Sequence, residues 1–436
     1  TLYQLIITNN SNLQNLQGLN NLKAIFGNVI IENNYNQINF QGLNNLEIIR
    51  DGDVHFQGLT GLENFEGLEN LKKISADFFV DDFRIKGCGM EDFTGLEGLD
   101  TIDIPRMEIS NCNNLTNFTG LNNLKYISGE LFIEHLNSIS DMSGLENLEI
   151  IGNDLWLWFN DNLEDLDGLN SLKSTRSFWI YFNDNLKTLE GLNSLTHTQG
   201  FLIVGFNPSL ESLEGLNNLE YTKGLAIDEN EFLTDLEPLS NLIEIDSHCT
   251  IWGNPNLLNL NGLENLETIN GWLRIYNNPV LESLEGLGAP AMVQVDSFIR
   301  IYNNPMLSNC AVETVCNRIS SDLPIEIYDN SDGCQSVPEV GFYCTTSTVD
   351  AINPEGAISI SPNPAKEAVA VNVEGERILQ IDLYNSSGVL LQSQPLGSNT
   401  SFDMVEYSLE EWSPGFYLLK IRTDQQIHTA KIIIEP

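Results

Sequence analysis

Residues 273–287 read Leu-Arg-Ile-Tyr-Asn-Asn-Pro-Val-Leu-Glu-Ser-Leu-Glu-Gly-Leu, and this stretch decides the fold. Leu273 and Ile275 alternate with longer polar or aromatic residues, which predicts a strand with one buried face. The Asn-Asn-Pro that follows predicts a corner. Leu281 and Leu284 supply a second inward edge, and the final Gly-Leu begins a third. The stretch therefore has the pattern of one coil of a stacked structure.

The phrase Gly-Leu-x-x-Leu-x-x-Ile recurs along most of the chain at steps of 23 to 28 residues. A fixed period of this size is typical of a solenoid, in which each repeat stacks on the next. We expect about thirteen coils over residues 1–309. Pro238 replaces the opening glycine once. The opening glycines are Gly18, Gly42, Gly67, Gly95, Gly120, Gly144, Gly168, Gly191, Gly215, Gly262 and Gly286.

Asparagine recurs at the corner of most coils. A buried corner leaves backbone N–H and C=O groups without partners, and a stacked amide can satisfy both. We interpret these residues as a structural ladder rather than a binding site. They are Asn10, Asn34, Asn160, Asn183, Asn207, Asn230, Asn254, Asn278 and Asn304.

Two successive coils carry cysteine at the asparagine position, Cys88 and Cys112. Neighbouring rungs lie roughly 4.7–4.9 Å apart, and disulfides accept Cα separations of roughly 4.4–6.8 Å. The spacing therefore permits a bond between them, and the alternative is a pair of small buried thiols. Cys249 falls on an inward strand position and is expected to be an inert core residue.

Four further cysteines crowd into residues 310–344, which we predict to be a cysteine-rich cap on the repeats. Such clustering suits an exported protein whose disulfides hold the cap in place. The segment has no Cys-x-x-Cys pair, which disfavours zinc. Three pairings are open to Cys310, Cys316, Cys334 and Cys344.

The repeats resemble a known family, the receptor L-domain. The similarity lies in Val-Ile-Ile-Glu-Asn-Asn at 29–34, in Leu-Glu-Ile-Ile at 46–49 and in the Asn-Pro-x-Leu corners. This is the leucine-rich β-helix of the EGF and insulin receptors. The resemblance implies a right-handed parallel β-helix over residues 1–309. It implies no particular ligand, because the receptors' ligand contacts lie in no shared motif.

Beyond the cap the pattern changes. Residues 345–357 are rich in Thr, Ser, Asn and Pro and are predicted to form a linker. Residues 358–436 contain six or seven short alternating segments, such as Val369 to Val373, which predict a small immunoglobulin-like β-sandwich. The predicted fold class is therefore all-β, with a long solenoid followed by a small sandwich.

Four motifs in residues 358–436 occur in the order found in a second family. They are Ser-Pro-Asn-Pro at 361–364, Ile-x-Leu-Tyr-x-x-x-Gly at 381–388, Pro-Gly-x-Tyr-x-Leu-x-Ile at 414–421 and Lys-Ile-Ile-Ile at 431–434. Together they resemble the C-terminal sorting domain of the type 9 (Por) secretion system. The sorting-signal residues implied by this resemblance are Pro362, Asn363, Pro364, Gly388, Gly415, Tyr417 and Lys431.

The sorting resemblance implies export through the periplasm and outer membrane to the cell surface or medium. The partner it implies is the outer-membrane translocon, which recognises the domain. The domain is then often cleaved and replaced by a surface anchor. The alternative is an ordinary immunoglobulin-like accessory domain. The chain begins at Thr1 without a leader, so we expect either that a leader was removed or that the sequence is a fragment.

The chain has 20 basic and 61 acidic residues and a net charge of −41. Nucleic acid is disfavoured as a partner, because its phosphates require Lys and Arg, and so is anionic lipid. No stretch approaches the roughly 20 apolar residues of a membrane helix.

Aromatic residues recur at outward positions of the predicted strands. Stacking should gather Trp156, Trp158, Trp179 and Tyr181 into an exposed cluster flanked by Phe132 and Ile203. Trp252, Tyr276 and Tyr302 should form a second stripe, and together these rings are numerous enough to bind a protein or a glycan. The alternative is that rings on neighbouring strands only stabilise the sheet. The corner residues Phe159, Phe182 and Phe206 are predicted to form a buried stack. The candidate partner-binding residues are Phe132, Trp156, Trp158, Trp179, Tyr181, Trp252, Tyr276 and Tyr302.

The sequence thus predicts an exported, adhesin-like binding protein. One alternative is a non-adhesive component of an outer-membrane gliding-motility or secretion assembly, and a lesser one is a polysaccharide-active β-helix enzyme. The five histidines belong to no nucleophile, metal or phosphate motif, so we expect no catalytic activity, no cofactor and no metal. No ligand-spaced Asp motif supports calcium.

Overall fold

The computed structural model describes two compact units, Thr1–Leu281 with Glu285–Phe298, and Glu282–Leu284 with Ile299–Pro436. The fold is all-β, with a solenoid of about 13 turns, few helices and small antiparallel sheets at the C-terminus, which confirms the predicted class. The described residues are 1–76, 82–287, 292–321, 323–352, 358–361, 366, 368–373, 377–385, 389–396, 404–409, 412–413, 415–424 and 427–434.

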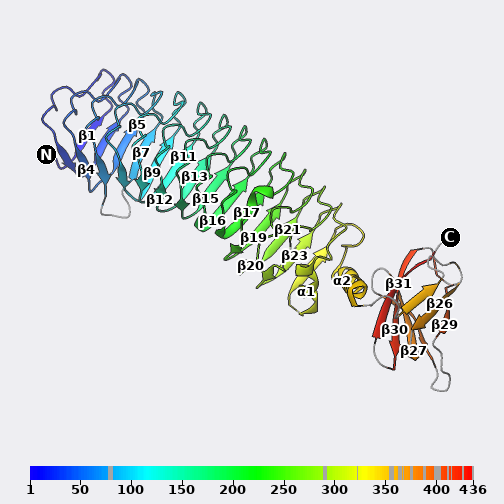
Figure 1. Ribbon diagram of the computed structural model, residues 1–436. Coiled ribbons are helices and arrows are strands. Elements are labelled where there is room, and N and C mark those ends of the chain that lie inside the picture. Colours follow the sequence, from blue (N-terminus) through cyan, green and yellow to red (C-terminus); the bar gives the residue numbers. More distant parts are fainter. Residues whose placement is uncertain are drawn as a thin grey trace. The chain divides into compact units, whose positions relative to one another are not determined.

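Each coil of the first unit contributes a principal strand, and each lies parallel to the principal strands of neighbouring coils (Figure 1). Alternate residues point inward, as in β3, where Val29 and Ile31 are buried. The principal strands are β1 (Leu5–Thr8), β3 (Val29–Glu32), β5 (Val54–Gln57), β7 (Asp82–Lys86), β9 (Arg106–Ser110), β11 (Glu130–Glu134), β13 (Leu155–Trp158), β15 (Phe178–Tyr181), β19 (Cys249–Trp252) and β21 (Leu273–Tyr276).

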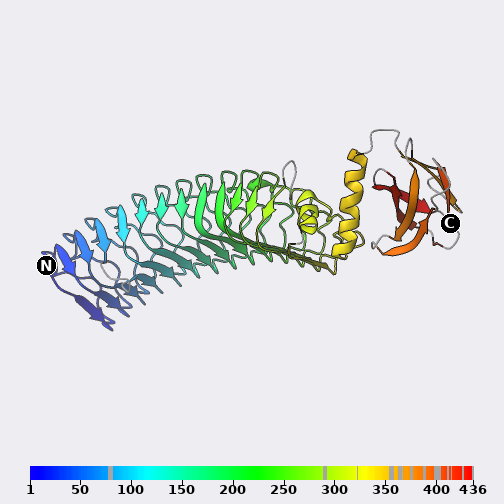
Figure 2. The ribbon, with the colours of Figure 1, turned by 90° about the horizontal axis from the view of Figure 1, so that it is seen from below.

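A short strand precedes the principal strand in most coils, and these short strands form a second parallel stripe (Figure 2). Two long strands, β16 (His197–Gly205) and β17 (Tyr221–Asp228), run through both stripes. The short strands are β2 (Ala24–Phe26), β4 (Ile48–Arg50), β6 (Lys73–Ser75), β8 (Thr101–Asp103), β10 (Tyr126–Ile127), β12 (Ile150–Ile151), β14 (Ser174–Thr175), β18 (Glu244–Ile245), β20 (Thr268–Ile269) and β22 (Gln294–Val295).

The recurring glycine is required by its backbone. Gly191 has φ +107°, and a Cβ there would collide with the carbonyl of Leu166 in the preceding coil. Only glycine meets both conditions without strain. Where Pro238 takes this position, its fixed negative φ changes the turn into a short 3₁₀ helix, η1 (Glu237–Leu239).

The corner asparagines form the expected ladder of amides. The backbone N–H of Asn183 donates to Oδ1 of Asn207 in the next coil at 3.1 Å. The Nδ2 group of Asn183 donates to the carbonyl of Leu157 in the preceding coil at 3.0 Å. The same exchange joins Asn207 to Asn230 and Asn230 to Asn254. Each amide therefore pairs the backbone groups that burial of the corner takes away from water.

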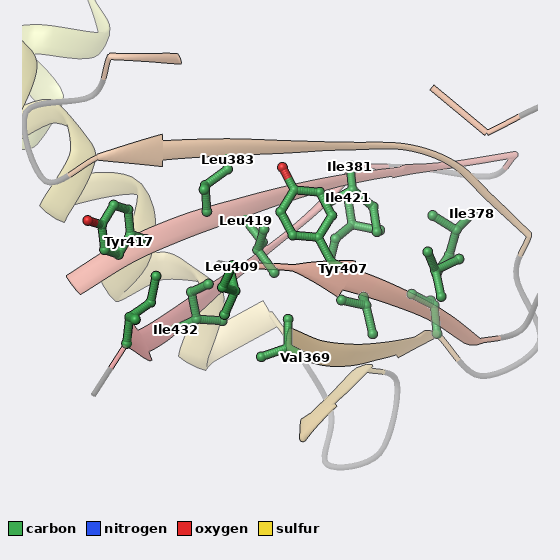
Figure 3. Close-up of a cluster of buried hydrophobic side chains, with 14 residues drawn as sticks. Val369, Ile378, Ile381, Leu383, Tyr407, Leu409, Tyr417, Leu419, Ile421 and Ile432 are labelled. Carbon is green, nitrogen blue, oxygen red and sulfur yellow. The ribbon is translucent and has the colours of Figure 1, made fainter. Parts of the chain in front are cut away.

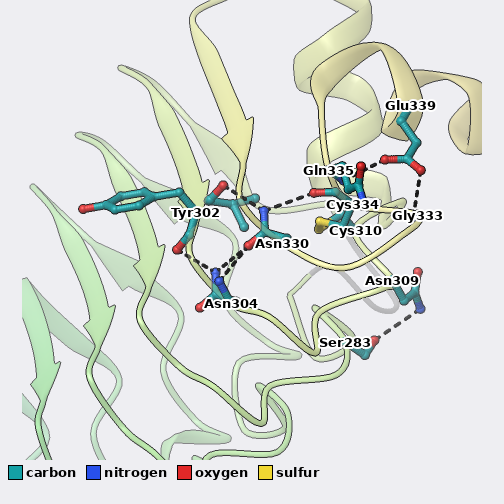
Figure 4. The surroundings of a disulfide bond; sticks show 11 residues. Ser283, Tyr302, Asn304, Asn309, Cys310, Asn330, Gly333, Cys334, Gln335 and Glu339 are labelled. Carbon is teal, nitrogen blue, oxygen red and sulfur yellow. Dashed lines mark hydrogen bonds between the residues drawn. A yellow bond between two sulfur atoms is a disulfide. The ribbon is translucent and has the colours of Figure 1, made fainter. Parts of the chain in front are cut away.

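The second unit contains one coil that the repeat pattern does not predict. Strand β24 (Ile325–Tyr328) lies inside the predicted cap and pairs in parallel with β23 (Ile299–Tyr302). Asn330 extends the amide ladder, because its Oδ1 accepts from the backbone N–H of Asn304 at 3.0 Å (Figure 4). The repeat boundary predicted at residue 309 therefore moves to Asn330.

Two disulfides hold the cap together. Cys310 is bonded to Cys334 and Cys316 to Cys344, with Cα separations of 5.5 and 5.3 Å (Figure 4 shows the first). These bonds select one of the three pairings that the sequence leaves open. The second bond connects helix α1 (Glu313–Ser320) to helix α2 (Val337–Ile352), and the first joins Cys310, just before α1, to Cys334, just before α2.

Helix α2 also changes the interpretation of residues 345–357. The segment predicted to be a linker is helical as far as Ile352. The sequence from 345 to 352 contains neither Gly nor Pro, and the first helix breaker is Pro354. Residues 353–357 lie outside the described part of the chain.

The C-terminal domain is a sandwich of two antiparallel sheets. One has the order β25-β26-β29 and the other β28-β27-β30-β31. Both contribute to a single core, in which Val369 and Tyr407 of the first sheet face Leu383 and Leu419 of the second (Figure 3). The strands are β25 (Ile358–Ser361), β26 (Ala368–Val373), β27 (Ile378–Asn385), β28 (Leu390–Pro395), β29 (Met404–Ser408), β30 (Gly415–Thr423) and β31 (Ile427–Ile434).

None of the helices in the described residues is both long enough and apolar enough to cross a membrane.

Candidate functional site

A stack of rings runs along the outward side of the principal strands. Register places Phe132 beside Trp156 and Trp156 beside Trp179. Their ring centroids are 5.3 and 4.6 Å apart, and each pair is within 7° of parallel. The guanidinium carbon of Arg106 lies 4.0 Å from the Phe132 centroid and closes one end of the stack by a cation–π contact.

A second outward position places Trp158 beside Tyr181. Trp158 meets Trp156 edge to face, at 4.9 Å and 89°. Tyr181 lies 6.5 Å from Trp179. The structure therefore brings the four residues of the predicted cluster into direct contact.

The predicted burial of the corner phenylalanines is wrong. Phe159 and Phe182 are 37 and 38% exposed, although they do stack, at 4.8 Å. Both have left-handed backbones, with φ of 54° and 57°. This conformation sends the next residue, the ladder asparagine, into the core and leaves the ring outside. In other coils the same corner position holds Asn9, Asn33 or Asn111, residues that tolerate this conformation and signal an exposed site.

The corner rings join the two stripes that the sequence analysis separates. Phe206 lies 4.9 Å from Phe182 and 5.8 Å from Tyr181 on one side. On the other side it meets Trp252 edge to face at 6.0 Å, and Trp252 stacks on Tyr276 at 5.6 Å. We call this connected surface the aromatic face. It comprises Phe132, Trp156, Trp158, Phe159, Trp179, Tyr181, Phe182, Phe206, Trp252 and Tyr276.

The eighth predicted residue, Tyr302, belongs to the second unit. There it stacks on Tyr328 of the last coil at 5.0 Å.

The rings of the aromatic face present mainly their edges. In the parallel pairs along the coils each ring covers a face of its neighbour, whereas Trp158 and Trp252 meet Trp156 and Phe206 edge to face. The indole N–H groups of Trp156, Trp158 and Trp179 are also buried, and within the described part of the chain they have no hydrogen-bond partner. The exposed part of these side chains is therefore hydrocarbon edge.

A buried acid lies within the aromatic face. Asp228 is 6% exposed, and the hydroxyl of Tyr181 donates to its Oδ2 at 3.5 Å, while its Oδ1 has no partner. Burial raises the pKa of Asp228 to about 7, against the opposing effect of hydrogen bonds from Trp252 and Tyr181. Gly205 occupies the neighbouring outward position, and the Tyr181 ring leans over it.

A second aromatic ladder, which the sequence analysis misses, lies one residue before the principal strands. His248 stacks on Trp272 at 3.6 Å, and Trp272 on Phe298 at 5.6 Å. The guanidinium of Arg274 lies 4.8 Å from the Trp272 ring. The signal available was the recurrence of rings at one position in successive coils.

One cluster has the composition of a metal site. Asp53, His55 and Asp82 each bring a ligand atom within 4.8 Å of the others. His55 Nε2 contacts Asp82 directly, and Arg84 pairs with the other oxygen of Asp82 at 2.6 Å. Asp53 accepts from the backbone N–H of Asp82 at 3.1 Å. Protein groups therefore already engage these carboxylates.

The cysteines of the solenoid are free thiols. Cys88 and Cys112, whose spacing permits a disulfide, are not bonded to each other. The Cys112 sulfur instead accepts from the Cys88 backbone N–H at 3.4 Å, as an asparagine Oδ1 does elsewhere in the ladder. Cys249 is fully buried, and burial raises the pKa of its thiol to about 12, so it is unreactive near neutral pH.

In the C-terminal sandwich, Gly415 begins β30, and the Tyr417 hydroxyl donates to the carbonyl of Ser413 at 2.7 Å. Lys431 lies on β31. The other implied sorting residues, Pro362, Asn363, Pro364 and Gly388, lie outside the described residues.

Comparison with known families identifies this domain. Residues 359–435 match the model of the Por secretion system C-terminal sorting domain. No curated protein is significantly similar to the chain. The sorting domain indicates export by the type 9 secretion system to the cell surface or the extracellular space.

Proposed function

We propose that this chain is an exported, adhesin-like binding protein, in which the solenoid presents the aromatic face to a protein or glycan partner. The observation that carries the proposal is the continuity of that face, from Phe132 to Tyr276 through the exposed corner rings. Aromatic side chains are enriched where proteins bind partners. The sorting domain places this surface outside the cell.

Two further proposals accompany it. We infer that the repeats are related to the leucine-rich β-helix of receptor L-domains, because Gly-Leu turns and Asn corners serve the same structural purpose in most coils. We also infer that the protein is not an enzyme. His55 contacts Asp82 directly, and His248 is packed against Trp272.

The test uses beads coated with purified protein on a panel of surfaces: bacterial cells, immobilised polysaccharides, and immobilised acidic and basic proteins. Wild-type beads should be retained on at least one surface. Replacing Trp156, Trp158 and Trp179 together by Ala should reduce retention at least tenfold. Trp272→Ala is the matched control, because it removes an indole from outside the aromatic face.

A second variant protects the test against misfolding. Phe159→Asn with Phe182→Asn places at these corners the residue that other coils carry in the same left-handed conformation. It should fold and still lose retention. Full retention by both variants, with unchanged circular dichroism, would refute the proposal. Stable co-purification with outer-membrane machinery in place of retention would indicate an accessory component.

A further inference from the structure

We propose that the partner of the aromatic face is a cationic polypeptide segment, with apolar side chains that pack on the ring edges and Lys or Arg side chains that pair with an acidic rim beside them. This inference rests on the proposed binding function and names the class of its partner. Two observations lead to it: the charge of the corners that carry the rings, and the orientation of the rings.

The first observation is a row of acids beside the rings. Asp161 and Asp184 follow the corner asparagines next to Phe159 and Phe182, and both are exposed. Two coils further on, Glu229 occupies the corner position itself, and Glu231 is exposed beside it. We call these four residues the acidic rim.

No basic residue offsets the rim within its own corners. The segments 157–164, 180–186, 204–210 and 227–233 contain neither Lys nor Arg. The nearby cations Lys173 and Lys187 already pair with Glu149 and Glu164, at 2.6 and 2.5 Å. The negative potential over this part of the surface therefore favours a partner of positive charge.

The second observation concerns what the rings can bind. Sugar rings stack on exposed aromatic faces, but the parallel pairs Trp156–Trp179, Phe159–Phe182 and Phe182–Phe206 cover faces of these rings with one another. The exposed hydrocarbon edges instead suit aliphatic side chains. The acidic rim opposes acidic polysaccharides, and in a chain of net charge −41 it also opposes a second copy of the same protein.

The dimensions suit an extended segment. From Phe132 to Tyr276 the face crosses six coil steps, and at about 4.8 Å per step it is about 29 Å long. An extended chain rises about 3.3 Å per residue, so about nine residues would cover it. Its alternating side chains could meet the rings and the rim in turn.

The experiment titrates three synthetic 12-residue peptides, amidated and acetylated, against the full chain by fluorescence polarisation. One alternates Lys with Leu, the second Glu with Leu, and the third Lys with Ser. The Lys-Leu peptide should bind at least tenfold more tightly than either of the others, because it alone supplies both charge and apolar contact. Cellohexaose serves as the neutral glycan probe.

Variants locate the binding. Asp161→Asn, Asp184→Asn and Glu231→Gln together should weaken the Lys-Leu peptide at least tenfold, and so should Phe159→Asn with Phe182→Asn. The matched control replaces Glu190, Glu214 and Glu237 by Gln. It removes the same charge from exposed positions at the Gly turns, away from the rings, and should change affinity less than threefold.

Three outcomes would overturn the inference: no binding of the Lys-Leu peptide, equal weakening by the control triple, or equal affinity for the Lys-Ser peptide. Cellohexaose binding that is lost in the Phe159 and Phe182 variant but kept in the rim variant would also overturn it. That last result would leave the proposed binding function intact. Failure of the proposed binding function is detected by a different experiment, the bead assay: there, the ring variants would be retained as well as the wild type.

Discussion

The asparagine at each corner stabilises the fold as an amide and not merely as a polar residue. Its Oδ1 accepts from one coil while its Nδ2 donates to another, so one side chain pairs backbone groups on both sides. Cysteine at positions 88 and 112 reproduces this geometry with a weaker group: the Cys112 sulfur accepts the Cys88 backbone N–H at 3.4 Å, and the Cys88 thiol donates to the carbonyl of Phe56 at 3.3 Å. The rungs on either side of this pair are Leu59 and Leu136, so the amide ladder is interrupted from Leu59 to Leu136 and resumes at Asn160.

Replacing Asn207 by Ala should cost roughly 2–4 kcal/mol of unfolding free energy, because it leaves the buried Asn183 N–H and Ile180 carbonyl without partners. Urea denaturation measures the change. Asn185→Ala is the control, since that amide is exposed and makes one long contact of 3.4 Å. Equal losses for the two variants would contradict a special role for the buried ladder.

Asp228 should make stability depend on pH. Its pKa rises from 3.8 unfolded to about 7 folded, so between these values the folded state binds the extra proton. Stability therefore falls as pH rises through this window, by about 3 kcal/mol between pH 5 and 8. Urea midpoints of the wild type and of Asp228→Asn, measured across this pH range, test the prediction, because the variant has no carboxyl group that can bind the proton. Parallel pH profiles would show that Asp228 titrates normally.

The exposed corner phenylalanines show where residue patterns mislead. Phe159 and Phe182 are apolar and recur in register, which by hydrophobicity alone predicts burial. Their backbone conformation, set by the need to send the next asparagine inward, decides otherwise. The sequence carried the clue in the residues that replace them in other coils, but a composition-based inference gives that clue less weight than hydrophobicity.

Among the single elements, the strand of the last coil could have been predicted from the sequence, whereas the helices of the cap could not. Ile-Glu-Ile-Tyr-Asp-Asn at 325–330 repeats Ile-Arg-Ile-Tyr-Asn-Asn at 299–304. The Gly-Leu turn that normally connects two such strands is absent, because helix α1 takes its place. A search that requires the turn therefore misses the strand.

The two disulfides should stabilise the end of the solenoid. They close loops with sequence separations of 24 and 28 residues, for which chain entropy predicts about 3 kcal/mol each. Replacing Cys316 and Cys344 by Ala should therefore expose the cap to proteolysis before the coils of the first unit. Limited proteolysis with mass spectrometry measures the order of cleavage. Replacing Cys249 by Ala is the control, and earlier cleavage in the coils would contradict the prediction.

For the molecule as a whole, the sequence predicted the architecture well because one period governs most of it. Register follows from the period, so the contacts of Trp156 with Trp179 and of Trp158 with Tyr181 could be derived residue by residue. The links made by Phe206 could not, because they depend on ring orientation at a corner. The pairing of the cap cysteines likewise depends on how irregular segments pack.

Export should depend on the C-terminal sandwich and not on the repeats. Residues 359–435 match a sorting domain, whereas the aromatic face belongs to the first unit. Deleting 359–435 should therefore leave folded repeats in the periplasm, with at least a tenfold loss of surface signal, because the translocon has nothing to recognise. Cell fractionation and surface antibody labelling measure this.

The Phe159→Asn, Phe182→Asn variant is the control, since it should reach the surface normally while losing retention. If the truncated chain reaches the surface as well as the full chain does, the sandwich is an accessory domain and another segment carries the export signal.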